Sequence, residues 1–209
     1  METFELKKDP YSVIITGTGG QGNVMASRVL SGMMEKQGYY VTIGETFGAS
    51  QRGGSVMSHI RISRKGNWSP QISKGRADVV VALEPIEVAR VLKDYGNPEV
   101  QVISNTYPIF PSNVISGKMQ YPSLDKIKES QEDLVKQAWY LDVTTEGVML
   151  GHHILANIII LGALSTLNEL PMNRDDFRAV MLDRIPERKL DMNLAAYDRG
   201  RELMEIYQA

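Results

Sequence analysis

Cysteine is absent from the 209 residues of this chain. Its absence excludes disulfides, a thiolate nucleophile, zinc sites built on cysteine and any iron–sulfur cluster ligated by cysteines of this chain. Long hydrophobic runs are also lacking, because the longest nearly unbroken one, Ile158 to Leu164, is far shorter than the ~18–20 residues that cross a bilayer. The first ten residues lack the apolar segment of a secretory signal. We therefore expect a cytoplasmic protein with no membrane partner.

An excess of charge of one sign is missing as well. Lysine and arginine total 23 against 25 for aspartate and glutamate, a formal net charge of -2. Such a balance gives no global field toward nucleic acid, although a local basic patch would not show in the total. We therefore expect no nucleic-acid partner. The 43% of hydrophobic residues is ordinary for a globular protein, and the length suits a single domain over residues 1–209.

Short apolar runs alternate with helical patterns along the chain. This alternation predicts an α/β fold, with a Rossmann-like, mostly parallel sheet, helices on both faces and the C-terminal helices packed on it. Strands are expected at 11–16, 39–43, 55–62, 78–83, 101–104 and 139–143, with a loop at 45–54. Helices are expected at 23–37, from Pro85 onward, near 124–137, at 174–182 and at about 191–207. Residues 148–167 are apolar nearly all round, which predicts one buried helix.

A glycine-rich turn links the first expected strand to the first expected helix. Gly17, Gly19 and Gly22 form a GxGxxG pattern there, and this context lets backbone N–H groups approach an anion at the helix N-terminus. With Gly20 and Gln21 they are candidate cofactor-binding residues. The alternative interpretation is an ordinary tight turn between a strand and a helix.

A dinucleotide-binding dehydrogenase is one function that this turn would serve. Such enzymes place an acidic residue ~20 residues after the glycines, at the end of the second strand, where it holds the ribose hydroxyls. Here Glu45 follows Gly17 by 28 residues, and Glu35 falls inside the expected helix. The spacing is poor. A free-standing dinucleotide-binding enzyme therefore stays as the second hypothesis.

A second small-residue loop follows the second expected strand. Its central residues, Ser50, Gln51, Arg52, Gly53 and Gly54, leave one guanidinium among small neighbours, where it can reach a phosphate or a carboxylate. Loops at the carboxyl ends of strands line the ligand crevice of an open α/β sheet. We expect this loop beside the glycine turn, where the two would form an anion-binding or subunit-docking corner with Gln21 and Gln51 as neutral partners. The alternative is a solvated arginine in a flexible loop.

Four other polar residues receive structural interpretations. His152 and His153 are adjacent, so on a helix they would point about 100° apart and chelate one metal poorly, and we expect core or capping histidines. His59 is expected to be a satisfied strand histidine. Asn157 is expected to bond a neighbouring loop's backbone, since a buried amide needs a partner. The basic residues of the expected hairpin are scattered and expected to be solvated: Arg61, Arg64, Lys65, Lys74 and Arg76.

Several motifs together carry a family resemblance that a lone GxGxxG would not. In order along the chain they are Gly17-Thr-Gly-Gly-Gln-Gly22, Ser50-Gln-Arg-Gly-Gly54, Ala77-Asp78 leading into Glu84-Pro85, Asn157-Ile-Ile-Ile-Leu-Gly162-Ala and, less distinctively, Asn193-Leu-Ala-Ala-Tyr-Asp-Arg-Gly200. The chain resembles the gamma-type subunit of 2-oxoacid:ferredoxin oxidoreductases over roughly residues 11 to 205. It is particularly similar to the beta subunit of indolepyruvate ferredoxin oxidoreductases, which belongs to the same domain family.

This resemblance implies a subunit with no catalytic residue and no metal ligand of its own. Its complex would oxidatively decarboxylate a 2-oxoacid, with indolepyruvate or another aryl pyruvate suggested first, to an acyl-coenzyme A and pass the electrons to ferredoxin. Thiamine diphosphate, Mg²⁺ and Fe–S clusters would lie on partner subunits, and the gamma-type domain on the coenzyme A side. The chain agrees in lacking cysteine and a GDG-type metal–diphosphate motif. Self-association of the isolated chain is expected, and a further alternative is an anion-binding assembly module.

Overall fold

The computed structural model describes residues 4–48 and 54–208. Within these ranges the chain forms a six-stranded sheet in the order β2-β3-β1-β4-β5-β6. The strands are β1 Tyr11–Thr18, β2 Tyr40–Phe47, β3 Ser55–Ser63, β4 Val79–Ala82, β5 Gln101–Asn105 and β6 Gln137–Leu141.

The sheet combines a parallel part with an antiparallel hairpin. Strands β1, β4, β5 and β6 run parallel, whereas β3 pairs antiparallel with both β1 and β2. The α/β class and the mostly parallel sheet are confirmed. Because the four parallel strands share one direction, their carboxyl ends meet at the same edge of the sheet.

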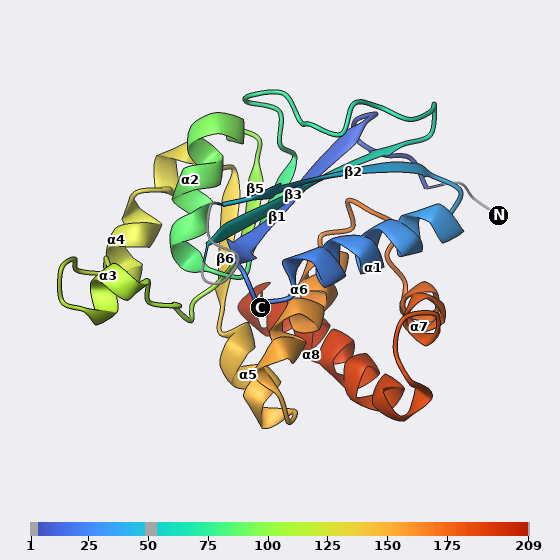
Figure 1. Ribbon diagram of the computed structural model, residues 1–209. Coiled ribbons are helices and arrows are strands. Elements are labelled where there is room, and N and C mark those ends of the chain that lie inside the picture. Colours follow the sequence, from blue (N-terminus) through green and yellow to red (C-terminus); the bar gives the residue numbers. More distant parts are fainter. Residues whose placement is uncertain (1–3, 49–53, 209) are drawn as a thin grey trace.

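Helices cover both faces of the sheet, as Figure 1 shows. Helix α2 lies on one face, with α4 beside it, and α1 lies on the other face together with the C-terminal helices. The helices are α1 Asn23–Lys36, α2 Pro85–Tyr95, α3 Ser112–Ile115, α4 Leu124–Glu129, α5 Val143–Met149, α6 Ala156–Ser165, α7 Arg174–Leu182 and α8 Leu190–Gln208. Among the described residues there are also three short 3₁₀ turns, η1 Glu132–Leu134, η2 His153–Leu155 and η3 Glu187–Lys189. None of the described helices has the length and hydrophobicity to span a bilayer.

Alternating side chains of β1 build two cores. Val13 and Ile15 join the larger cluster, which includes α1 and the C-terminal helices, whereas Ile14 joins the smaller cluster beneath α2. All three side chains are fully buried. The period-2 alternation of a strand thus gives each helical layer its own apolar surface.

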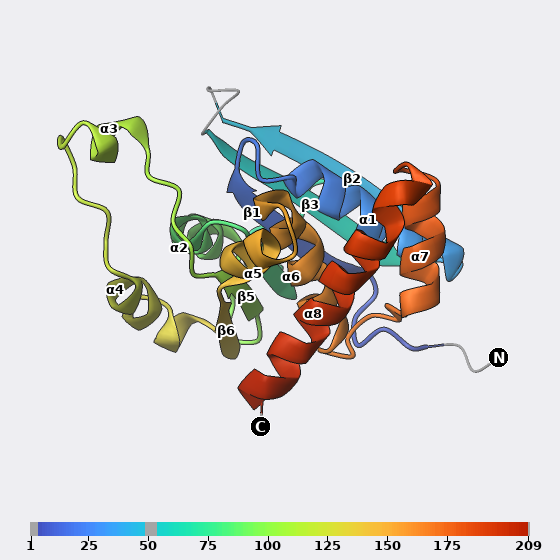
Figure 2. The same ribbon diagram turned by 90° about the horizontal axis from the view of Figure 1, so that it is seen from below.

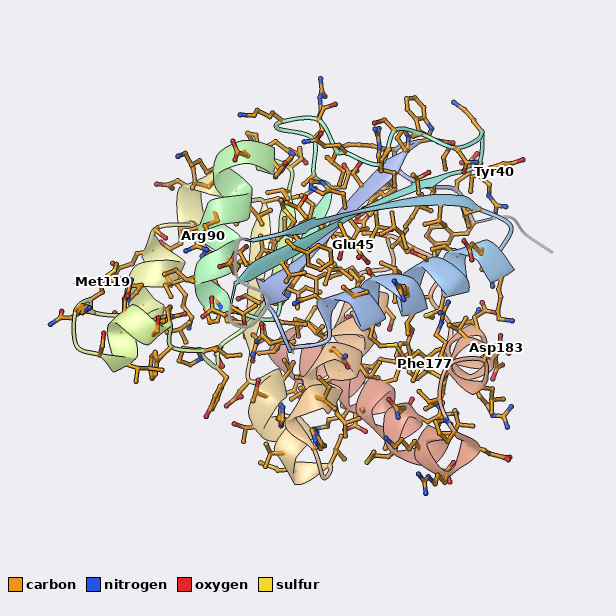
Figure 3. The ribbon with its side chains drawn as sticks, in the orientation of Figure 1. Tyr40, Glu45, Arg90, Met119, Phe177 and Asp183 are labelled. Atoms are coloured by element: carbon orange, nitrogen blue, oxygen red, sulfur yellow. The ribbon has the colours of Figure 1, made fainter. Side chains whose placement is uncertain are left out.

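Helices α6 and α8 cross at two glycines, and Figure 2 shows them side by side. A Cβ atom on Gly162 would lie 2.0 Å from the Tyr197 carbonyl oxygen, and one on Gly200 would lie 1.8 Å from that of Ile159. Two of the family-like motifs therefore contain glycines that permit close helix packing. Phe177 of α7 is labelled in Figure 3. Its ring stacks on that of Tyr197, with the ring centroids 4.3 Å apart.

The expected single helix over 148–167 is wrong. The segment instead forms α5, the turn η2 and α6. Gly151 has a φ of 112°, outside the helical region, and the His152 ring accepts a hydrogen bond from the Ile154 N–H at 3.1 Å. Hydrophobicity all round indicated burial correctly for α6, whose residues are all buried, but it did not reveal the break.

Other boundaries moved because strand pairing overrides local pattern. Strand β2 continues to Phe47, which pairs with Val56, so the loop expected at 45–54 begins later. The helix expected near 124–137 ends at Glu129, and β6 starts at Gln137 because it pairs there with Gln101. The last strand therefore covers 137–141 instead of 139–143. Helix α7 has the expected bounds, α1 ends one residue earlier than expected, and α8 is one residue longer than expected at each end.

Candidate functional site

Two glycines are required by the shape of the turn between β1 and α1. Gly17 lies within β1, and a Cβ there would come within 2.6 Å of the Gln21 Oε1 atom and 2.7 Å of Asn23 Oδ1. Gly22 precedes α1 with a φ of 85°, and a Cβ there would approach Asn157 Nδ2 to 2.1 Å. The positive φ of Gly22 and the close contacts around both positions therefore account for these two glycines without a ligand.

The Gln21 side chain braces this turn. Its Oε1 accepts hydrogen bonds from the Thr18 N–H at 2.7 Å and the Thr18 hydroxyl at 3.2 Å. Its Nε2 donates to the Leu83 carbonyl, just beyond β4, at 2.7 Å. Both polar ends of the amide are thus engaged within the protein. The part of Gln21 in ligand binding stays a prediction, and any ligand would compete with these bonds.

The N-terminus of α1 offers donors at the same edge of the sheet. Its first turn holds no acidic residue, and Gly22 has no side chain to cap it. The N–H groups of a first turn carry partial positive charge, which favours a bound anion. Asn157 Nδ2 donates to the Gly22 carbonyl at 3.3 Å, which confirms that this amide bonds a neighbouring loop.

The second predicted loop falls largely outside the described residues, which exclude Ser50, Gln51, Arg52 and Gly53. Gly54, however, is described. Its carbonyl accepts a hydrogen bond from the Gly19 N–H at 2.9 Å. The described end of the loop therefore lies against the glycine turn, at the place that the sequence predicted.

A cleft of about 420 Å³ opens beside the turn, at the carboxyl edge of the parallel strands. Its walls are mainly apolar, with hydroxyl groups and an imidazole among them. It is lined by Gln21, Leu83, Tyr107, Ile109, Thr144, Thr145, Val148, His153, Ile154 and Ala156. A mostly apolar cleft with a few polar groups is typical of a ligand or partner site.

Asn105, the last residue of β5, bonds several of the residues that line this cleft. It is fully buried, and its Nδ2 donates to the Leu83 carbonyl at 3.0 Å and to the Thr144 hydroxyl oxygen at 2.9 Å. Its Oδ1 accepts from the Tyr107 N–H at 3.3 Å. One amide thus joins the ends of β4 and β5 to α5, and three residues that line the cleft depend on it.

Two buried carboxylates at the start of α2, one on its N-cap residue and one in its first turn, bond segments that flank the site. Glu84 accepts from the Ile86 N–H at 2.8 Å and from the Tyr121 hydroxyl at 2.5 Å. Glu87 accepts from the Ser55 hydroxyl at 2.5 Å and from Arg90 at 2.8 Å. Arg90 is labelled on α2 in Figure 3. Glu84 therefore ties down the segment after β5, and Glu87 ties down the residue after Gly54.

The three histidines of the chain have different surroundings. His152 caps η2, as its bond to Ile154 shows, so the capping interpretation is confirmed for it. His153 lines the cleft. His59 is 2% exposed and meets the Tyr95 ring edge-on, and its Nδ1 has no hydrogen-bond partner among the described residues. The expectation of a satisfied histidine at 59 is therefore wrong, and burial lowers its pKa.

The strand order bears on the dinucleotide hypothesis. In the dinucleotide-binding fold the second strand lies next to the first, which brings its terminal acid to the ribose. Here β3 lies between β1 and β2. Glu45, labelled on β2 in Figure 3, pairs with Ser58 of β3. This carboxylate is therefore separated from the glycine turn by an intervening strand.

The chain matches the family model for pyruvate ferredoxin/flavodoxin oxidoreductase over residues 12–203. It belongs to this family. The indolepyruvate oxidoreductase subunit IorB of Thermococcus kodakarensis is a relative, 31% identical over 191 residues, which cover 91% of this chain and 94% of that protein. The resemblance read from the glycine motifs is thereby confirmed.

Solved structures share the fold of this oxidoreductase family member. The gamma subunit of the keto/oxoacid ferredoxin oxidoreductase from Geobacter sulfurreducens PCA superimposes with a TM-score of 0.66 at 19% identity, covering 94% of this chain and 99% of that one. A 2-oxoglutarate:ferredoxin oxidoreductase from Magnetococcus marinus gives 0.73 at 21% identity, covering 96% of this chain and 32% of that one. The second structure holds 2-oxoglutarate, coenzyme A and succinyl-CoA.

Sequence reasoning missed several residues that shape the site in this family member. Asn105 and Thr144 stand at the ends of unremarkable short segments, and Tyr121 lies in a proline-containing stretch read only as a connection. Glu84 carried a usable signal, because an acid directly before a proline at a helix start is a candidate cap. Its longer-range bond to Tyr121 depends on the fold and left no local pattern.

Replacing Glu84 with glutamine should change how stability depends on pH. Burial raises the pKa of Glu84 above its ordinary value of 4.5, so as pH rises the unfolded chain releases this proton before the folded protein does. The folded state therefore loses stability as pH rises from about 4.5 through the folded-state pKa. Glu84→Gln removes this loss. The melting temperature of Glu84→Gln should rise relative to that of the wild type as pH increases above about 4.5, until it passes the folded-state pKa. A difference in melting temperature that does not change with pH would contradict the assignment.

Proposed function

We propose that this chain is the gamma-type subunit of a 2-oxoacid:ferredoxin oxidoreductase and that it acts only within a cytoplasmic complex. The observation that carries the proposal is the family match over residues 12–203 in a chain without cysteine. A member that offers no cysteine ligands leaves electron transfer through iron–sulfur clusters to other subunits. The whole chain, residues 1–209, would then be one gamma-type domain, and ferredoxin would accept the electrons of the complex.

The cofactors divide by the donor groups that this chain offers. Fe–S clusters need thiolates, and the chain has none; thiamine diphosphate with Mg²⁺ needs a metal–diphosphate motif of the GDG type, which the sequence lacks. Both are therefore assigned to partner subunits. Coenzyme A differs from these two cofactors in the groups that it needs, because its phosphates bind N–H donors and cations. The two glycine loops, residues 17–22 and 50–54, here called the glycine corner, would provide such groups.

We assign the anion-binding corner to the two glycine loops. Gly17, Gly19, Gly20, Gln21 and Gly22 would provide the turn and the start of α1, and Ser50, Gln51, Arg52, Gly53 and Gly54 the opposite loop. The bond from the Gly19 N–H to the Gly54 carbonyl supports this grouping. The corner would hold a phosphate of coenzyme A or an acidic group of the partner subunit. It orients that group, and the thiamine on the partner supplies the chemistry.

An exposed arm after β5 supports a subunit role. Residues 106–123, here called the arm, contain a single charged residue, Lys118, and Figure 2 shows α3 standing away from the sheet. Phe110 is 51% exposed, Ile115 75% and Met119 60%, and Met119 is labelled on the arm in Figure 3. Such an apolar surface with a single charge is typical of one that another subunit covers.

The substrate class follows the named relatives. The Thermococcus kodakarensis relative is an indolepyruvate oxidoreductase subunit, so we propose indolepyruvate or another aryl pyruvate as the 2-oxoacid of the complex. Because the reaction takes place at the thiamine, the residues that select this substrate are expected on the partner.

Co-purification tests the proposal. The chain is co-expressed with the thiamine-binding, cysteine-rich protein encoded nearest to its gene, and the mixture is separated by size exclusion. Wild type should comigrate with that protein, and a Phe110→Ser, Ile115→Ser, Met119→Ser variant should comigrate less. Ile206→Ser, at a side chain 69% exposed on α8, is the matched control and should behave as wild type.

The possible outcomes separate the two parts of the proposal. If wild type stays free of the partner, the subunit assignment fails. If the arm variant comigrates as well as wild type, the arm is not the contact surface. Calorimetry of the free chain with NAD(H), NADP(H) and FAD checks the dinucleotide alternative, which measurable binding of any of the three would support.

A further inference from the structure

A second cleft lies at the edge of the sheet opposite to the candidate site. It has a volume of about 500 Å³ and is formed where the parallel strands begin. Ser12 stands near the start of β1, Asp78 directly before β4 and Glu99 shortly before β5. The described part of this cleft includes both acidic and basic side chains, so their pairing decides what the cleft can bind.

The carboxylates of the cleft already have partners. Asp78 accepts from Lys8 Nζ at 2.7 Å and from the Ser12 N–H at 2.8 Å. Glu99 accepts from Lys136 Nζ at 3.2 Å. The third carboxylate, Asp9, accepts from two neutral groups, the Ser63 hydroxyl at 2.5 Å and the Arg64 backbone N–H at 3.2 Å.

Two arginines that line the cleft have no carboxylate partner among the described residues. Arg61 extends from β3 with its guanidinium 5.0 Å from the centre of the Trp68 ring, and its Nη1 donates to the Ser69 carbonyl at 3.4 Å. Its enclosed Nε finds no acceptor in the described part of the chain. Arg76 is exposed at the mouth. The expectation of solvated basic residues is therefore wrong for Arg61, which is half-buried and held in place.

The nearby end of α2 does not compete for these cations. A helix C-terminus carries partial negative charge on its last carbonyl groups. Here the Asp94 carbonyl accepts from the Gly75 N–H at 2.9 Å, and the Tyr95 carbonyl accepts from the Ala77 N–H at 3.0 Å. These bonds come from the segment that carries Arg76. Within the described part of the cleft, the two guanidinium groups thus outnumber the carboxylates that lack a cationic partner, of which there is one, Asp9.

We propose that this cleft binds a small free anion bearing a carboxylate or phosphate group, held between Arg61 and Arg76. A positioned guanidinium forms charge-assisted bonds with both groups. The cleft volume lies within the range of small-molecule sites. The inference is independent of the proposed function, because none of its residues belongs to the glycine corner, the first cleft or the arm.

Titration of the full chain with inorganic phosphate, and separately with succinate, tests this site. Calorimetry and NMR shifts at low salt should show saturable binding of at least one anion. Arg76→Gln, at an exposed side chain, should keep the melting temperature and weaken binding about tenfold or more. Lys65→Gln removes an equal charge from an exposed neighbour that does not line the cleft and should bind as wild type.

Three results would overturn the proposal. Shifts that never saturate, or equal weakening in Arg76→Gln and Lys65→Gln, would mean only diffuse attraction to basic residues. A third result concerns the source of the anion. If both probes bind the free chain but are expelled when the partner subunit joins, the cleft docks a carboxylate of that subunit. Binding that survives assembly supports a free small ligand.

Discussion

Gly200→Ala is expected to lower the free energy of unfolding by about 3 kcal/mol or more, because overpacking a close contact costs about this much. A Cβ at this position would lie 1.8 Å from the Ile159 carbonyl oxygen and 2.8 Å from the Ala163 backbone nitrogen. Both are backbone atoms of α6, so no side-chain rotation relieves the clash. For a chain of this length the loss corresponds to a fall of roughly 6–12 °C in melting temperature.

The sign of this effect separates packing from helix propensity. Replacing glycine with alanine inside a helix should by itself stabilise by up to ~1 kcal/mol. Ala195→Ser, at an exposed position of the same helix, enlarges a side chain without meeting α6 and should shift the melting temperature little. Thermal unfolding of both variants is the measurement. A Gly200→Ala protein as stable as wild type would mean that α6 and α8 do not cross at this glycine.

Arg52→Ala is expected to lower the rate of coenzyme A-dependent turnover by the assembled complex by about 10- to 150-fold. The loss of one charge-assisted contact costs roughly 1.5–3 kcal/mol, which converts to that range. The free chain should keep its melting temperature, because a loop arginine among small residues contributes little to the core. Arg52→Lys should restore activity only partly if the contact is bidentate.

Paired measurements distinguish a binding role from a structural one. Steady-state kinetics at varied coenzyme A concentration are compared with melting curves of the free chain. Arg178→Ala, which removes an exposed arginine from α7, controls for the change in net charge. If Arg52→Ala and Arg178→Ala give the same activity and coenzyme A dependence as wild type, Arg52 is an ordinary solvated side chain.

The layers of the fold could be predicted because each depends on a local pattern. The compact β-branched run at the start of β1 and the apolar run of β4 indicated buried strands, and Gly38, with a φ of 78°, ended α1 as expected. Helix α2 began at Pro85, capped by Glu84. Misplaced boundaries, such as the end of β2 at Phe47, depend on which strand lies alongside, and a window of one sequence does not contain that information.

The sequence predicted where the two glycine loops would meet, but not the side-chain contacts around them. Two glycine loops following strands were expected to meet, and the Gly19–Gly54 hydrogen bond joins their described parts. The buried links of Asn105 to Thr144 and of Glu84 to Tyr121 span 39 and 37 residues. Each joins segments whose proximity is set by the sheet. Physical reasoning can find such pairs only after the strand order is known.

The most direct test of the account is the activity of this chain alone. The purified chain is supplied with indolepyruvate, thiamine diphosphate, Mg²⁺ and coenzyme A, and reduction of a viologen dye is followed with and without the co-purified partner subunit. The account predicts no reduction by the chain alone and coenzyme A-dependent reduction by the complex. Turnover of the 2-oxoacid by the isolated chain would contradict it.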